Sequence, residues 1–153
     1  MRLILSFFLA AALLAASDLS SIKTIYVEDL GGAEGSDLIR EKMINLLVES
    51  PYFSVTEKRD SADGVITGLA EMSKSEVFHG SANKESAAVS GGTSWDGTIA
   101  IRLVDRDGNI VWTKNAKPGR WSGSVSGSLA KNAVKDLEKK MKQALKNSRK
   151  DRD

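Results

Sequence analysis

The sequence predicts an α+β domain in which a mixed β-sheet of about five strands is packed by two helices, in the order strand, helix, strands, helix. β-Branched and aromatic residues gather in several short runs, while apolar residues recur at helical spacing near both ends of the chain. The 153 residues include no cysteine, so one core must be held by packing alone, without disulfides or thiolate zinc sites.

The chain begins with the pattern of a secretory signal peptide. Arg2 supplies a positive start, an apolar run extends from Leu3 to Ala16, and Ala15 and Ser17 are small residues that suit cleavage after Ser17. The alternative, a retained anchor, is disfavoured because the run is shorter than the roughly 20 residues that span a bilayer. No cysteine follows to carry a lipid. We expect a periplasmic or secreted protein with a signal peptide at 1–17, one domain at 18–148 and a charged tail at 149–153.

The first strand and helix are predicted at the start of this domain. Residues 22–29 (IKTIYVED) favour a strand that enters the glycine-rich segment 30–35. Ser36 is the expected N-cap of a helix that Pro51 ends near Ser50. The expected apolar face of this helix comprises Leu38, Ile39, Met43, Leu46 and Leu47.

Further strands are predicted at 52–57, 65–78, 98–105 and 109–114, with a turn at 60–64. The last two form a hairpin around the turn Asp105-Arg106-Asp107-Gly108. One of its strands should bury Ile99, Ile101 and Leu103, and the other should point Ile110 and Trp112 to the same side.

Residues 79–97 (HGSANKESAAVSGGTSWDG) contain almost no large apolar side chain, so we expect a flexible insertion that adds little to the core. If the flanking strands pair antiparallel, this segment becomes the tip of a long projecting hairpin with Trp95 near its base.

The second helix is predicted at 125–147. Its apolar side comprises Val125, Leu129, Ala133, Val134, Leu137, Met141 and Leu145, and most of its lysines lie opposite. From Lys131 to Asp153 the chain has nine Lys or Arg against four Asp or Glu. This excess suits either a solvated helix face or peripheral contact with an anionic surface.

These elements resemble the superfamily that contains the amino-terminal domain of TolB and the CsgG-type curli-assembly proteins. The resemblance rests on KTIYVEDL, SDLIREKMINLLVES, YFSVTEK, ADGVITGLAEM and IAIRLVDRDGNIVWT, followed by a helix rich in alanine and lysine, and it covers most of residues 22–146. It implies an envelope component that binds other proteins or assembles, without catalysis.

The residues themselves predict no catalytic, cofactor or metal site. His79 is the one histidine and is expected at the surface, and no G-x-S-x-G elbow is present. The segment GGAEGSD lacks the lysine of a phosphate-binding loop. Asp105, Asp107 and Asn109 have calcium-loop spacing, but Ile110 and Ala116 stand where glycine and glutamate are required. The formal net charge of +2 gives no reason to expect nucleic acid.

We therefore expect a non-catalytic protein that binds another envelope protein through the segment 79–97 and the nearby sheet edge. The candidate partner-binding residues are His79, Trp95, Arg120 and Trp121, although a lid over the core is the favoured interpretation of Trp121. One alternative is a self-assembling subunit joined through edge strands. Another is a small-ligand or hydrolytic site at the glycine loop 31–35, lined by Asp29, Gly32 and Ser36.

Overall fold

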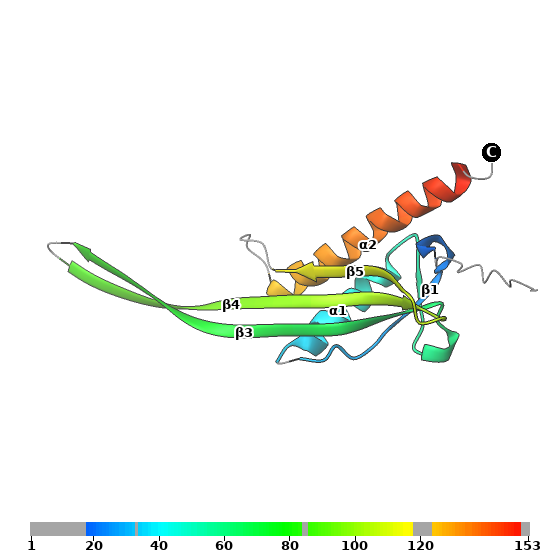
Figure 1. Cartoon of the computed structure of the whole chain (residues 1–153). Coiled ribbons are helices and arrows are strands. Elements are labelled where there is room, and N and C mark those ends of the chain that lie inside the picture. Colours follow the sequence, from blue (N-terminus) through cyan, green and yellow to red (C-terminus); the bar gives the residue numbers. More distant parts are fainter. Residues whose placement is uncertain (1–17, 33, 84–85, 118–123, 151–153) are drawn as a thin grey trace, which may run out of the picture.

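The computed structural model describes residues 18–32, 34–83, 86–117 and 124–150 and confirms the α+β class, whereas the expected signal peptide at 1–17 lies outside the described residues. The elements in chain order are η1 (Leu19–Ser21), β1 (Thr24–Val27), α1 (Ser36–Val48), β2 (Ser54–Val55), η2 (Arg59–Ser61), β3 (Gly64–Asn83), β4 (Ser86–Asp105), β5 (Ile110–Ala116) and α2 (Val125–Lys150). The five strands form one mixed sheet in the order β2-β1-β3-β4-β5. β1 is parallel to β2 and β3, and the remaining neighbours are antiparallel (Figure 1).

The core lies between one face of the sheet and the two helices, which also pack against each other. Alternate strand residues point into it, as period-two geometry requires. The fully buried side chains that fill the core include Ile25, Val27, Ile39, Met43, Leu47, Ile66, Ile99, Leu103, Leu129, Leu137 and Met141. The opposite face carries no helix in the described part of the chain, and Leu69 of β3 is 55% exposed there.

Helix α1 begins differently from the prediction. The N-cap is Gly35, at φ 87°, and Ser36 is the first helical residue. A Cβ at Gly35 would lie 2.7 Å from Cε of Met72, so both the left-handed backbone and the close packing favour glycine. The buried stripe is Ile39, Met43 and Leu47 at four-residue spacing, and this leaves Leu38 outside it, 49% exposed.

The β4–β5 hairpin is confirmed, but the prediction that Ile110 and Trp112 share a side is wrong. Leu103 pairs with Trp112 and Val104 pairs with Ile110, so Val111 is an extra residue in β5. This bulge moves Ile110 to the face of Val104, where it is 55% exposed, while Trp112 stays buried.

Strands β3 and β4 are much longer than predicted. Residues 79–97 do not form a separate insertion, because their backbone continues an unbroken antiparallel ladder out to the pair Asn83 and Ser86. The flanking strands do pair antiparallel, so these residues form the outer part of a long projecting hairpin, as expected for that case. We call the ribbon formed by Ser73–Asn83 and Ser86–Asp96 the arm; at about 3.3 Å per residue it extends about 35 Å (Figure 1).

The molecule has two distinct ends. Both α1 and α2 begin near the base of the arm, since Gly35 contacts Met72 and the first turn of α2 packs on Gly97. The arm projects from one end of the body, whereas the last turns of α2 rise from the other, close to the described start of the chain (Figure 1). The predicted charged tail is partly helical, because α2 continues to Lys150.

Candidate protein-binding surface

The arm presents two backbone edges that no other described strand covers. On the β3 side, pairing with β1 and the glycine loop ends at Met72, whose N–H donates to the carbonyl of Glu34 over 3.3 Å. On the β4 side, pairing with β5 ends at the pair Ile99 and Ala116. Beyond these points the described chain offers each strand one neighbour, its partner in the arm. Unpaired strand edges are templates for another strand.

The direction of the backbone groups in the arm follows from the regular ladder. The carbonyls of Ile66 and Gly68 accept hydrogen bonds from the β1 side, and the N–H of Asp105 donates toward β5. The ladder between β3 and β4 has no register shift, so this alternation continues along both strands. In β4 the odd-numbered residues, such as Val89 and Thr93, therefore direct N–H and C=O away from β3.

The sequence of the distal part of β4 does little to block such pairing. Residues 86–95 (SAAVSGGTSW) contain neither a charged residue nor a proline, the two kinds of residue that commonly protect exposed edges. Glycine, alanine and serine predominate, and such small side chains allow another backbone to approach. This composition is visible in the sequence, but it indicates a candidate binding edge only once the pairing of β3 with β4 is known.

The base of the arm is fixed by the first turn of α2. A Cβ at Gly97 would lie 2.8 Å from the carbonyl oxygen of Glu71 and 3.0 Å from Cγ1 of Val125. Glycine therefore allows α2 to approach the sheet at this point. Trp95 lies two residues further out on the same face, and it remains 42% exposed. A half-exposed tryptophan beside an uncovered edge has the character of a binding anchor.

The glycine loop supports the other side of the base. The N–H of Gly31 donates to the carbonyl of Gly68 over 3.1 Å, and the N–H of Ala70 donates to the carbonyl of Gly31 over 2.9 Å. Gly32 approaches β3 so closely that a Cβ there would lie 2.1 Å from the carbonyl oxygen of Ala70. The loop is thus a short extension of the sheet that continues the parallel pairing of β1.

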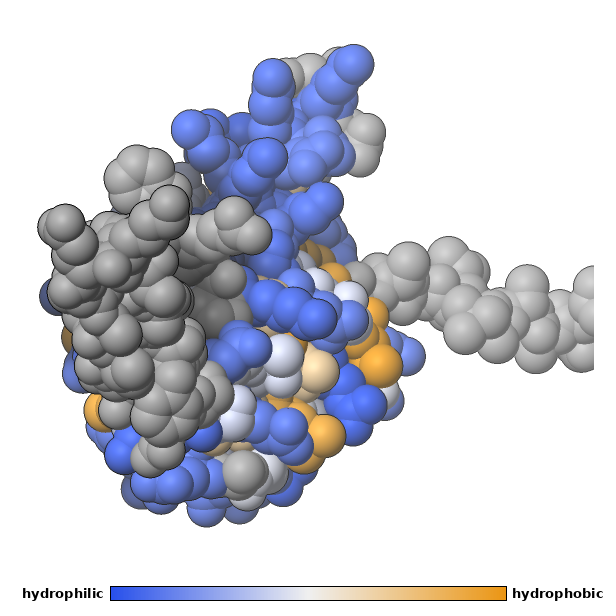
Figure 2. All heavy atoms as spheres, turned by 90° about the vertical axis from the view of Figure 1, so that its left-hand side faces the viewer, coloured by the Kyte–Doolittle hydropathy of each residue, from blue (hydrophilic) through white to orange (hydrophobic). Residues whose placement is uncertain are grey.

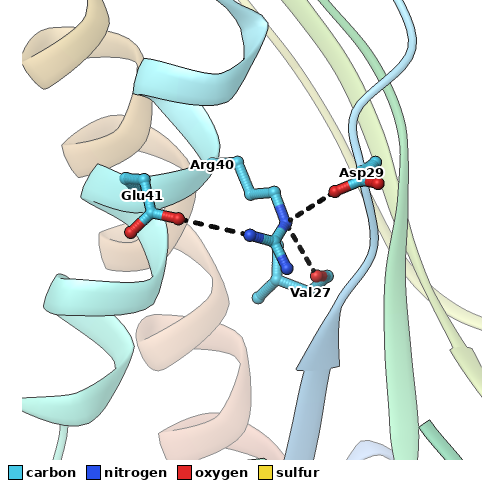
Figure 3. A network of polar contacts seen from close by, with 4 residues as sticks. All are labelled: Val27, Asp29, Arg40 and Glu41. Carbon is cyan, nitrogen blue, oxygen red and sulfur yellow. Dashed lines mark hydrogen bonds and ion pairs between the residues drawn. The ribbon is translucent and has the colours of Figure 1, made fainter. Parts of the chain in front are cut away.

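Arg40 holds this loop to α1 (Figure 3). Its Nε donates to the carbonyl of Val27 over 3.0 Å and lies 3.4 Å from Oδ1 of Asp29. Its Nη1 is 3.3 Å from a carboxylate oxygen of Glu41 on the same helix. The guanidinium is mostly buried, whereas Asp29 is almost fully exposed. The bond to the strand end, where β1 becomes the loop, is therefore the stronger restraint.

Two carboxylates join the strands of the sheet to other segments of the chain. Asp63 accepts hydrogen bonds from the N–H groups of Thr24 and Lys23 and pairs with Arg106 over 3.1 Å. The bond from Thr24 is the main cause that lowers the pKa of Asp63, and the charge of Arg106 adds to it although partial burial opposes it.

Asp136 of α2 accepts from Trp112 Nε1 over 3.0 Å and from Lys114 Nζ over 3.1 Å. Partial burial raises the pKa of Asp136, but the two hydrogen bonds and the charges of Lys114 and Lys140 outweigh it and lower the pKa overall. These bonds join α2 to the edge strand β5.

The predicted site residues are only partly brought together. The backbone of His79 lies in the distal arm opposite Ser90, and its side chain is outside the described part of the structure. Trp95 lies at the arm base as expected. Arg120 and Trp121 fall outside the described residues, so whether Trp121 lids the core is not tested. Among the described residues, no cluster of three metal-ligating side chains occurs and no helix is apolar and long enough to cross a bilayer.

The chain has a distant structural likeness to a protein of known structure. No protein-family model matches the chain. No curated protein matches it. A solved structure of a PelC dodecamer from Paraburkholderia phytofirmans is similar over 76% of this chain and 86% of that chain, with 15% sequence identity and a TM-score of 0.47.

Proposed function

We propose that this chain is an exported, non-catalytic protein-binding module and that the arm is the part that contacts its partner. The observation that carries the proposal is the pair of backbone edges along Ser73–Asn83 and Ser86–Asp96 that no other described strand covers. The expected signal peptide and the resemblance to TolB and CsgG domains agree with a role in binding or assembly in the cell envelope.

The partner binds by adding a strand to the β4 edge of the arm. Main-chain hydrogen bonds supply the affinity in this mode of recognition. The edge from Ser86 to Trp95 is the better of the two, because the β3 strand of the arm carries Lys74 and Glu76. Trp95 gives the added strand an aromatic contact where the arm joins the body.

The arm itself supplies a physical reason for a partner. Isolated two-stranded hairpins are at best marginally stable in water, and three or more strands are needed for independent stability. Among the described side chains, the core residues of β3 and β4 nearest the arm are Ala70 and Ile99, with Met72 packed beside them, and no described core residue lies in the arm itself. A third strand stabilises the arm, and binding is therefore coupled to its ordering.

Proline substitutions test this mode of binding. Val89→Pro with Thr93→Pro removes two N–H groups that point away from β3 and leaves the donors of the ladder in place. The matched control, Val89→Ala with Thr93→Ala, keeps every N–H. Crosslinking in the native envelope should give the same adduct from the wild type and the alanine variant and none from the proline variant. An adduct that survives both prolines contradicts strand addition.

A second copy of the chain is the other candidate partner, since the uncovered edge is present on every copy. Two β4 edges can pair antiparallel about a twofold axis, as in isologous dimers. Light scattering on the purified chain separates these candidates. A monomer that nevertheless gives the envelope adduct favours a different protein, whereas a dimer lost with the two prolines favours self-assembly.

A further inference from the structure

The end of α2 opposite the arm has an unusual concentration of positive charge. Between Lys139 and Lys150 the sequence holds six Lys or Arg and no Asp or Glu. Within the described chain, the ion pairs of the structure involve none of these six side chains. We call Lys139–Lys150 the basic end. Figure 2 shows the part of the molecule that rises above the body coloured almost wholly as hydrophilic.

The fold does not require this charge. Cations near a helix C-terminus offset the helix dipole, but that effect is confined to about the last turn. Lys139, Lys140 and Lys142 lie well before it. Lys142, Lys146 and Lys150 repeat at four-residue spacing, and like charges at that spacing destabilise a helix. The lysines therefore destabilise the end of α2, and an interaction with something outside the folded domain would explain their presence.

A groove of about 870 Å³ runs along this end. Its lining includes Tyr52 and Leu145, both partly buried against the core, together with Lys142, Lys146, Arg149 and Lys150. Tyrosine beside lysine and arginine is the combination that proteins place at the level of lipid headgroups. The groove thus joins apolar contact with attraction for anions.

The other cations of the basic end face different sides of the helix. Lys139 lines a hollow with Lys114 and Asp136, and Lys140 lines another with Leu19 and Val111. Charge distributed around a protruding helix end suits an extended anionic surface better than one compact ligand or one acidic peptide.

The described chain begins beside the basic end. η1 packs against α2, with Leu19 near Lys140 and Ala144. While the expected signal peptide is still attached during export, this end of the domain is therefore the end nearest the bilayer.

We propose that the basic end docks the domain on the headgroups of an anionic phospholipid bilayer, with the arm directed away from the membrane. This contact is independent of the proposed binding by the arm. Polybasic segments near a membrane gain attraction from anionic lipid that is worth about a fivefold change in binding per lysine, and salt weakens it.

The test uses vesicle sedimentation with the chain from Asp18 onward, which holds the entire described core. Vesicles of phosphatidylcholine with roughly one quarter phosphatidylglycerol should bind the chain, and vesicles of phosphatidylcholine alone should not. Replacement of Lys142, Lys146 and Lys150 by glutamine should weaken binding about a hundredfold at low salt. The matched control replaces the exposed Lys58, Lys131 and Lys135 by glutamine, which removes the same charge and should change binding less than about threefold.

Circular dichroism on both triple variants verifies that each is folded. Equal binding to both kinds of vesicle, or equal losses in both triple variants, overturns the proposal. Polyglutamate that binds the chain more tightly than the anionic vesicles do also overturns it, in favour of an acidic protein partner. The variant with glutamine at Lys142, Lys146 and Lys150 should still give the envelope adduct, because the arm is unchanged. Loss of vesicle binding with the adduct retained therefore separates this proposal from the proposed function of the arm.

Discussion

At the scale of single residues, Asp63 joins three segments. Its carboxylate accepts from the backbone of Lys23 and Thr24 at the start of β1 and pairs with Arg106 in the β4–β5 turn. Asp63→Ala leaves the partly buried N–H of Thr24 and the exposed N–H of Lys23 without their acceptor and removes the pair with Arg106, and we expect it to lower the free energy of unfolding by about 1–3 kcal/mol. Urea denaturation measures this loss. The exposed neighbour Asp60 is the control, and Asp60→Ala should stay within about 0.5 kcal/mol of the wild type.

The pKa values of Asp63 and Asp136 predict how stability depends on pH. Both carboxyls have folded-state pKa values below the usual 3.8. Their contribution is present in full above the unfolded-state pKa and is lost as the pH falls through the lower folded-state pKa. The free energy of unfolding should therefore fall below about pH 4, and the double variant Asp63→Asn with Asp136→Asn should show a shallower fall. Identical acid profiles for the variant and the wild type would contradict this assignment.

At the scale of elements, the sequence predicts the helices and strands whose apolar side chains fill the core. The stripes Ile39, Met43, Leu47 and Leu129, Ala133, Leu137 follow helical periodicity, and Ile99, Ile101, Leu103 alternate, so their elements were placed correctly. The predictions were wrong where the local structure depends on backbone geometry and not on the side-chain pattern. These places are the left-handed Gly35 cap, the Val111 bulge and the distal halves of β3 and β4. Residues 79–94 have almost none of the large apolar side chains that mark a strand, and their pairing depends on main-chain groups.

The arm contains none of the described core residues. Val77 and Gly92 form a hydrogen-bonded pair in the ladder, so Asn-Gly in place of residues 78–91 closes a two-residue hairpin between them without a change of register. We expect the urea midpoint of this trimmed chain to stay close to that of the wild type, because every core residue that the structure describes lies outside the deletion. A midpoint that falls steeply would show that the distal ribbon stabilises the body.

At the scale of the whole molecule, the two proposed contacts lie at opposite ends (Figure 1). The arm projects beyond the beginnings of α1 and α2, and the basic end lies beside η1 and Tyr52. Sites that share no residues should behave additively. The trimmed chain is therefore expected to bind anionic vesicles as the wild type does, as vesicle sedimentation will show. A loss of vesicle binding on trimming would mean that the arm, and not α2, meets the lipid.

The most direct test of strand addition is amide hydrogen exchange along residues 86–96, read residue by residue by nuclear magnetic resonance. In the free chain, the odd-numbered amides of β4 point outward and should exchange faster than the even-numbered amides, which bond to β3. In the adduct isolated from the envelope, we predict that the outward amides become as protected as the inward ones. Outward amides that exchange equally fast in both states would contradict the account.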